Sequence, residues 1–108
     1  MSQVRAAALL LTLLAAQAAP AQALPAARQS ELVRMVRQDC GSCHGLTMKG
    51  GLGPALLPLN ISEKDPEQLR FVILHGRRGS AMPPWSRFLT EAEAAWVVEL
   101  LRMGLPRD

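Results

Sequence analysis

The 108-residue chain has few of the side chains from which a small protein usually builds its core. It contains no tyrosine, two phenylalanines and two tryptophans, although aromatic side chains normally supply much of a core's buried area. Its two cysteines are too few for a scaffold of several disulfides. Apolar residues still make up 49% of the chain and charged residues 19%, as in folded globular proteins. We therefore expect one small domain that needs a disulfide, a metal or a cofactor for extra stabilisation.

Charge is not concentrated in any one segment. Twelve basic and nine acidic residues give a net charge of +3, and the pI is about 9.5. The basic residues are scattered and no nucleic-acid-binding motif accompanies them, which argues against DNA or RNA as a partner.

The longest apolar run lies at the start of the chain. An uncharged, largely apolar run of eleven residues, 6–16, follows Arg5, and Ala21-Gln22-Ala23 fits the small-x-small rule for cleavage before Leu24. The pattern predicts a signal peptide over residues 1–23. A membrane anchor is the alternative, but a spanning helix needs about 20 apolar residues, and Gln17, Pro20 and Gln22 interrupt the continuation of this run.

Residues 24–108 would form the mature protein, with eleven basic and nine acidic residues and a net charge of +2. No later segment resembles a transmembrane helix, and no cysteine at the cleavage point could carry a lipid. We expect an exported, periplasmic domain with no stable membrane insertion after cleavage.

Apolar periodicity predicts three helices, and no segment alternates as a strand does, so the expected fold class is all-α. The first helix should cover about residues 30–40, with Ser30 as its N-cap and Glu31 in its first turn. Its apolar stripe comprises Leu32, Val33, Val36 and Cys40.

Local capping signals mark the other two helices. Asp65 is the expected N-cap of the second, with Gln68 completing a capping box and Gly76 ending the helix. Its expected apolar face is Leu69, Val72 and Ile73. The third should begin at the Thr90-Glu91-Ala92-Glu93 capping box and end at Gly104, with Trp96, Leu100 and Met103 on its apolar face.

Two long loops separate these helices. Residues 45–62 contain four glycines, and residues 76–89 contain two glycines and two prolines. Loops of this length are uncommon in a small domain unless they have a function. The sequence therefore predicts three helices and two loops around a bound group.

Cys40-Gly41-Ser42-Cys43-His44 identifies that group, because Cys-x-x-Cys-His is the attachment motif of c-type haem. Cysteines three positions apart lie on one face of a helical turn, so each can form a thioether with a haem vinyl group. His44 then follows as the proximal iron ligand. A redox dithiol would need a βαβ context, and a zinc site would need four ligands from the two cysteines and two histidines present.

Met82 is the expected second axial ligand. It lies in Ala81-Met82-Pro83-Pro84-Trp85, where two prolines stiffen an extended segment. His75 is an alternative, although a histidine at a helix C-terminus is also explained by the helix dipole. Met48 lies too near His44 along the chain, and Met35 and Met103 are expected in the core.

The motif order resembles class I cytochromes c over residues 28–105: a helix leading into Cys-x-x-Cys-His, a Gly-Pro, a middle helix, a Met-Pro loop and a C-terminal helix. The resemblance implies three main helices and long loops around one covalent haem. It implies that the carbonyl of Pro54 accepts a hydrogen bond from the ring N–H of His44. It also implies that the first and last helices cross, with Trp96 and Leu100 meeting Leu32 and Val36.

A closer resemblance is to the cytochrome c55X family. It is carried by Met82-Pro83-Pro84-Trp85 and by Cys40-Gly41-Ser42-Cys43-His44-Gly45-Leu46-Thr47-Met48-Lys49-Gly50-Gly51-Leu52-Gly53-Pro54-Ala55-Leu56. The resemblance implies a periplasmic carrier of single electrons to cytochrome cd1 nitrite reductase in denitrification, with an unknown upstream donor. The alternative it implies is an accessory factor in maturation or insertion of that reductase's haem d1.

An iron held by His44 and Met82 has no open position, which favours electron transfer over enzymatic chemistry. An open-site haem enzyme or gas sensor would require Met82 to bind weakly. Arg77 and the indole N–H of Trp85 are candidates for contacts with haem propionates. The basic loop residues Lys49, Arg77, Arg78 and Arg87 can form a docking rim or be ordinary solvated charges.

Overall fold

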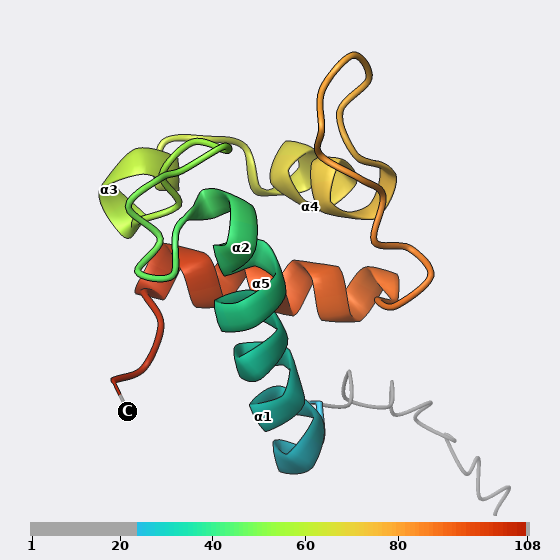
Figure 1. Cartoon of the computed structure of the whole chain (residues 1–108). Coiled ribbons are helices and arrows are strands. Elements are labelled where there is room, and N and C mark those ends of the chain that lie inside the picture. Colours follow the sequence, from blue (N-terminus) through green and yellow to red (C-terminus); the bar gives the residue numbers. More distant parts are fainter. Residues whose placement is uncertain (1–23, 108) are drawn as a thin grey trace, which may run out of the picture.

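The computed structural model describes residues 24–107, so the expected signal peptide over residues 1–23 lies outside the described part. All regular elements within these residues are helices, in agreement with the expected all-α class. In chain order they are α1 (Ala26–Met35), the π-helix η1 (Val36–Cys40), α2 (Gly41–His44), α3 (Pro58–Ile61), α4 (Pro66–His75) and α5 (Glu91–Met103). Figure 1 shows α5 crossing α1, with α2, α3, α4 and both long loops on one side of α5.

The first helical segment is longer than expected, because α1, η1 and α2 follow one another without a break. The prediction of Ser30 as N-cap is wrong: Pro25 occupies that position and makes no side-chain cap. Instead Gln29 ties the start of the helix to the preceding chain, since its side-chain amide donates to the carbonyl of Leu24 at 2.9 Å. Leu24 in turn packs against the core.

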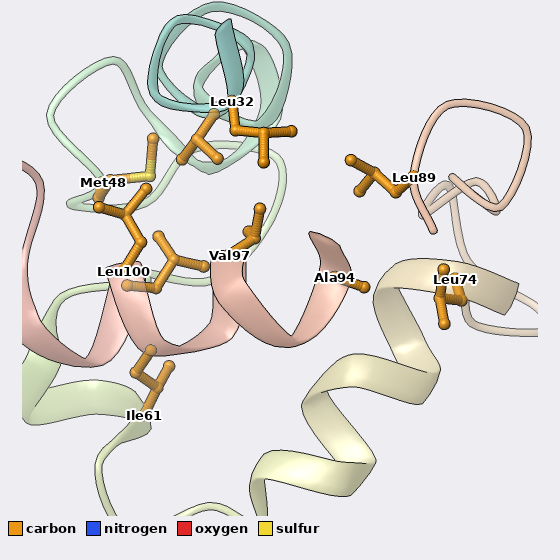
Figure 2. Close-up of a cluster of buried hydrophobic side chains, with 10 residues drawn as sticks. Leu32, Met48, Ile61, Leu74, Leu89, Ala94, Val97 and Leu100 are labelled. Carbon is orange, nitrogen blue, oxygen red and sulfur yellow. The ribbon is translucent and has the colours of Figure 1, made fainter. Parts of the chain in front are cut away.

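The core lies where α1 and η1 meet α5. Leu32 and Val36 are completely buried, and they cluster with buried residues of α5 that include Ala94 and Val97. Figure 2 shows Leu32 above Val97, with Leu100 beside Val97 on the same helix. Leu100 is buried as expected, whereas Trp96 packs only partly against the cluster.

A side-chain network joins the starts of α1 and α5. Arg28 pairs with Glu31 at 2.8 Å and also with Glu93, 65 positions away. Glu93 completes the predicted capping box, since its backbone N–H donates to Thr90 Oγ1 at 3.1 Å and its carboxylate accepts from the Thr90 N–H at 2.9 Å. The Arg28 guanidinium holds the pKa of Glu93 below its ordinary range, and the Thr90 N–H contributes to this shift.

Helix α4 has the predicted bounds, but its N-terminus is capped differently. The carboxylate of Asp65 accepts from the backbone N–H of Glu67 at 3.0 Å, and the expected capping box with Gln68 does not form. Leu74 is the buried residue that joins α4 to the core, while the expected face of Leu69, Val72 and Ile73 is half-buried. Arg70 links α4 to α5 through Glu91 at 2.9 Å.

Met103 lies differently from the sequence expectation, and Met48, for which the sequence predicted no core position, is buried. Met103 is not in the core but 78% exposed, because nine positions after Ala94 place it two and a half turns further, on the opposite side of α5. Met48 is 3% exposed and belongs to the core. The first long loop is also interrupted, since α3 forms within it and buries Ile61.

Candidate functional site

The Cys-x-x-Cys-His motif lies on regular helical backbone. Cys40 ends η1, and Cys43 and His44 end α2. Because three residues are nearly one helical turn, the two cysteines share a face. Both are free: Cys40 is half-buried and Cys43 exposed. Burial, assisted by neighbouring Asp39, raises the pKa of Cys40 to about 11, so its thiol remains protonated at neutral pH.

The imidazole of His44 is held through one of its two nitrogens. Its Nδ1 lies 2.7 Å from the carbonyl oxygen of Pro54, and a carbonyl can only accept, so Nδ1 carries the proton and donates. This fixes the tautomer in which Nε2 has a free lone pair for a metal. A Cβ at Gly53 would lie 2.7 Å from ring atoms Cε1 and Nδ1. Glycine at this position therefore allows the loop to lie against the ring.

Backbone hydrogen bonds hold the loop after His44 against α2. The N–H of Gly50 donates to the carbonyl of His44, and that of Gly53 donates to the carbonyl of Cys43, each at 2.8 Å. The N–H of Leu56 donates to the carbonyl of Met48 at 2.9 Å. Met48 has φ +60° and inserts its side chain into the core. The loop is thus anchored at both its backbone and its one buried side chain.

The Met82 segment is held by the end of α4. Gly76 ends α4 with φ +71°, and a Cβ there would lie 2.6 Å from the Met82 carbonyl oxygen. The N–H of Arg77 donates to that oxygen at 3.2 Å, and the N–H of Met82 donates to Ser80 Oγ at 3.3 Å. Trp85 closes the segment by donating its backbone N–H to the carbonyl of Ile73 at 2.9 Å.

The other candidate residues lie around this segment. Met82 and Trp85 are half-buried, and the Trp85 ring lies 5.7 Å from that of Phe88. Arg77 is exposed. His75, the alternative axial ligand, is also exposed, and its ring centroid lies 4.6 Å from that of Phe71. Within residues 24–107 no hydrogen bond joins the Met82 segment to the Cys-His motif.

These residues fit a covalently bound haem. Two free thiols share one helical face, the next side chain offers a ring nitrogen of fixed tautomer, and a thioether stands on a separate, proline-stiffened segment. Half-buried apolar side chains at the edge of the core, Leu56, Ile73 and Trp85, offer the kind of surface that a porphyrin face requires.

The sequence resemblance named the Gly53-Pro54 pair for its carbonyl contact with His44, but it identified neither the close approach of Gly53 to the ring nor the contact of Ser80 with Met82. Gly53 could have been inferred from its place before the implied carbonyl acceptor, because that carbonyl can approach the ring only along a backbone without a Cβ. Ser80 carries only a general signal, because serine hydroxyls often bond the backbone N–H two residues on, as Ser80 does with Met82.

Residues 27–101 match the family model described as cytochrome C oxidase, cbb3-type, subunit III. The chain is 52% identical over 94 residues to the cytochrome c55X of Paracoccus denitrificans (strain Pd 1222), covering 87% of this chain and 90% of that protein. It is 47% identical over 98 residues to the cytochrome c55X of Stutzerimonas stutzeri, covering 91% and 83%.

Two similarities extend this comparison. The solved structure of the c-type cytochrome NirC matches with a TM-score of 0.73 and 46% identity, over 75% of this chain and 95% of that one. A dihydro-heme d1 dehydrogenase of Pseudomonas aeruginosa is 42% identical over 74 residues, which are 68% of this chain but only 15% of that protein. The similarity therefore concerns one part of a much larger molecule.

Proposed function

Because the chain belongs to the cytochrome c55X family of c-type cytochromes, we propose that it is a monohaem carrier that passes single electrons to cytochrome cd1 nitrite reductase in denitrification. The hydrogen bond between His44 Nδ1 and the Pro54 carbonyl is the observation that most supports a haem carrier, because it leaves Nε2 as the ligating nitrogen.

Each site residue has a defined role in this proposal. Cys40 and Cys43 would hold the haem through thioethers. His44, through Nε2, and Met82, through its sulfur, would be the iron ligands, which would leave the iron unavailable to oxygen or peroxide. The bound haem supplies a one-electron couple, with a potential raised by the thioether ligand.

Three further residues tune or hold this group. The carbonyl of Pro54 orients the His44 ring and makes Nε2 a stronger electron donor by accepting a hydrogen bond from Nδ1–H. Arg77 is exposed and follows the C-cap of α4, where its guanidinium is available to a propionate. Trp85 covers the group with its ring or donates its indole N–H to a propionate.

We also propose that the protein works in the periplasm after removal of residues 1–23. The cleavage pattern in the sequence supports export. Among the helices of residues 24–107, none is long and apolar enough to span a bilayer.

A second candidate function is a role in maturation or insertion of haem d1. One observation favours it: the chain is similar to part of a dihydro-heme d1 dehydrogenase, whose solved structure in complex with DHE it matches with a TM-score of 0.61 and 41% identity. That match covers 69% of this chain and 16% of the dehydrogenase chain. A shared domain of this kind would serve electron transfer in either process.

The experiment that separates the two functions uses a strain that lacks this gene. Nitrite reductase purified from it should contain its full complement of haem d1 but receive electrons slowly in intact cells. Complementation with the wild-type gene should restore the electron supply, whereas a Cys43→Ala gene should not. A reductase without haem d1 would instead identify a maturation factor, and a loaded, fully supplied reductase would contradict both functions.

A further inference from the structure

Arg28, in the first turn of α1, makes contacts that reach the end of the second long loop, residues 76–89. Its Nη2 donates to the carbonyl of Phe88 at 3.1 Å, its Nη1 pairs with Glu31 at 2.8 Å, and its Nε pairs with Glu93. Each of the three guanidinium nitrogens therefore has its own acceptor. Because Phe88 and Glu93 lie 60 and 65 positions away along the chain, this one side chain joins α1, the second loop and α5.

The carboxylate of Glu93 fixes the direction in which the Arg28 guanidinium points. Glu93 is 8% exposed, and its Oε1 accepts from the Thr90 N–H at 2.9 Å in the capping box of α5. Its Oε2 pairs with Arg28, so both carboxylate oxygens are engaged. A guanidinium is a rigid planar fork. Pairing through Nε and Nη1 therefore leaves Nη2 aimed at the Phe88 carbonyl.

The Phe88 carbonyl belongs to a tight turn that closely follows Met82. The backbone N–H groups of Phe88 and Leu89 both donate to the carbonyl of Trp85, at 2.9 and 3.0 Å, and the Trp85 and Phe88 rings lie 5.7 Å apart. Only two prolines separate Trp85 from Met82. Because proline has a fixed φ, the backbone between them has little freedom to flex. A shift of the turn is thus passed on to the Met82 segment.

We propose that Arg28 is a positioning residue for Met82. Through the Phe88 carbonyl it holds the turn of residues 85–89 in place, and the held turn favours binding of the Met82 sulfur to the iron. Loss of this contact frees the end of the loop, so that Met82 leaves the iron more often. The inference rests on the proposed function, because it takes Met82 as an axial ligand. It makes the pairing of Arg28 with Glu93, where α1 and α5 begin, part of how that ligand is held.

Arg70 offers a matched control within the same chain. It pairs with Glu67, three positions earlier on its own helix, and with Glu91 in the first turn of α5 at 2.9 Å. Arg28 likewise pairs with one glutamate three positions away and one in that turn, and the two arginine side chains are 34% and 32% exposed. In the described part of the chain Arg70 makes no hydrogen bond to the second loop. Replacing either arginine removes similar ion pairs, but only the Arg28 variants also lose the bond to Phe88.

The first measurement is azide binding to the ferric holoprotein, because azide can occupy the iron only when Met82 has left it. Arg28→Lys should bind azide about three- to tenfold more tightly than the wild type, since lysine keeps the charge but lacks the rigid fork that reaches three acceptors. Arg28→Gln should gain at least as much, and Arg70→Lys and Arg70→Gln should stay within about twofold of the wild type. If neither Arg28 variant exceeds its Arg70 counterpart, the proposal is overturned.

The second measurement is amide hydrogen exchange of the same ferrous proteins, which locates the effect without using the haem as its readout. The amides of Phe88 and Leu89 should exchange about three- to tenfold faster in the Arg28 variants than in the Arg70 variants. The amide of Val97, inside α5, should respond alike in both pairs. Equal acceleration at the turn and inside α5 would show a merely structural role for Arg28 and overturn the proposal.

Failure of the proposed function would look different from failure of this inference. If the wild type keeps Met82 on the iron but does not reduce cytochrome cd1 nitrite reductase, the proposed function fails, and azide binding and amide exchange still decide the role of Arg28. If the wild type reduces the enzyme and the Arg28 variants behave like the Arg70 variants in both measurements, only the positioning role fails. An unchanged ferric spectrum in Met82→Ala would remove the ligand itself and overturn both.

Discussion

The loop after His44 and the loop after α4 hold their candidate ligands in different ways. The histidine loop is fixed at several points, by donors from Gly50 and Gly53 to the carbonyls of α2, by the His44–Pro54 contact and by the buried side chain of Met48. The methionine loop, which follows α4 and contains Met82, is attached to α4 mainly through the backbone N–H groups of Gly76 and Trp85. Residues 77–81, which lie between these two points, are all exposed.

This difference indicates how the two ligands would respond to perturbation. Opening the histidine side requires several backbone hydrogen bonds to break and a core side chain to leave its place. Opening the methionine side requires the loss of two bonds of 3.2 and 3.3 Å that hold the Met82 backbone. Segments with few buried contacts open at lower free energy. We therefore expect the methionine to be the ligand that can be removed without losing the haem.

The largest test compares the two sides directly. Cys43→Ala should remove most covalent haem, because one of the two thioethers is lost. Met82→Ala should retain the haem and open one axial position, so that the ferrous protein binds carbon monoxide at neutral pH. Haem-stained denaturing gels measure the first effect, and optical titration with the gas measures the second. An unchanged ferric spectrum in Met82→Ala would refute the ligand assignment.

A smaller effect is expected from a single methyl group on the histidine side. In Gly53→Ala the new Cβ would lie 2.7 Å from the ring, so the ring must turn or the loop must move, and the bond to Pro54 is lost. Loss of such a supporting hydrogen bond typically lowers metal affinity by about 10- to 100-fold. Because Nε2 of His44 then donates less electron density to the iron, the reduction potential of the haem should rise, as cyclic voltammetry would measure.

Gly79→Ala on the methionine side is the control. Gly79 has φ +75° but nothing lies within 4 Å of its Cβ position. The substitution should cost about 1 kcal/mol of folding stability through backbone strain and leave the potential unchanged. Equal shifts of potential in both variants would show that the close approach at His44 is not the cause.

The helix boundaries show what the sequence could and could not predict. Helices α4 and α5 begin and end where their caps predict, because Asp65, Thr90, Gly76 and Gly104 act within a few residues. The start of α1 could not be read locally, since the contacts of its first turns include Glu93, 65 positions away from Arg28. No sequence signal marked the π-helix before Cys40.

The candidate site divides in the same way. The Cys-x-x-Cys-His motif and the Met-Pro segment are each a short run of consecutive residues, so both could be found in the sequence. Their binding of iron remains a prediction. The contacts that hold these two motifs in place were harder to predict from the sequence. Ser80 accepts from the N–H of Met82, two residues further along the chain, in a local turn that a serine can form but that its presence in the sequence does not require.

Ser80 provides the finest test of the difference between the loops. Its hydroxyl donates to the Arg77 carbonyl at 2.8 Å and accepts from the Met82 N–H at 3.3 Å. Ser80→Ala removes both bonds, a loss of about 0.5–1.5 kcal/mol. The Met82 segment should then open more readily, and azide should bind the ferric protein about two- to tenfold more tightly, as optical titration would measure.

Ser42 on the histidine side is the matched control. It is an exposed serine whose hydroxyl donates to the Asp39 carbonyl at 2.7 Å within the helical run. Since the histidine side is held by many other bonds, Ser42→Ala should leave azide affinity unchanged. An equal increase in both variants would mean that azide affinity follows general stability, and the two loops would then not differ in how firmly they hold their ligands. An increase confined to Ser80→Ala would locate the weaker attachment at the methionine.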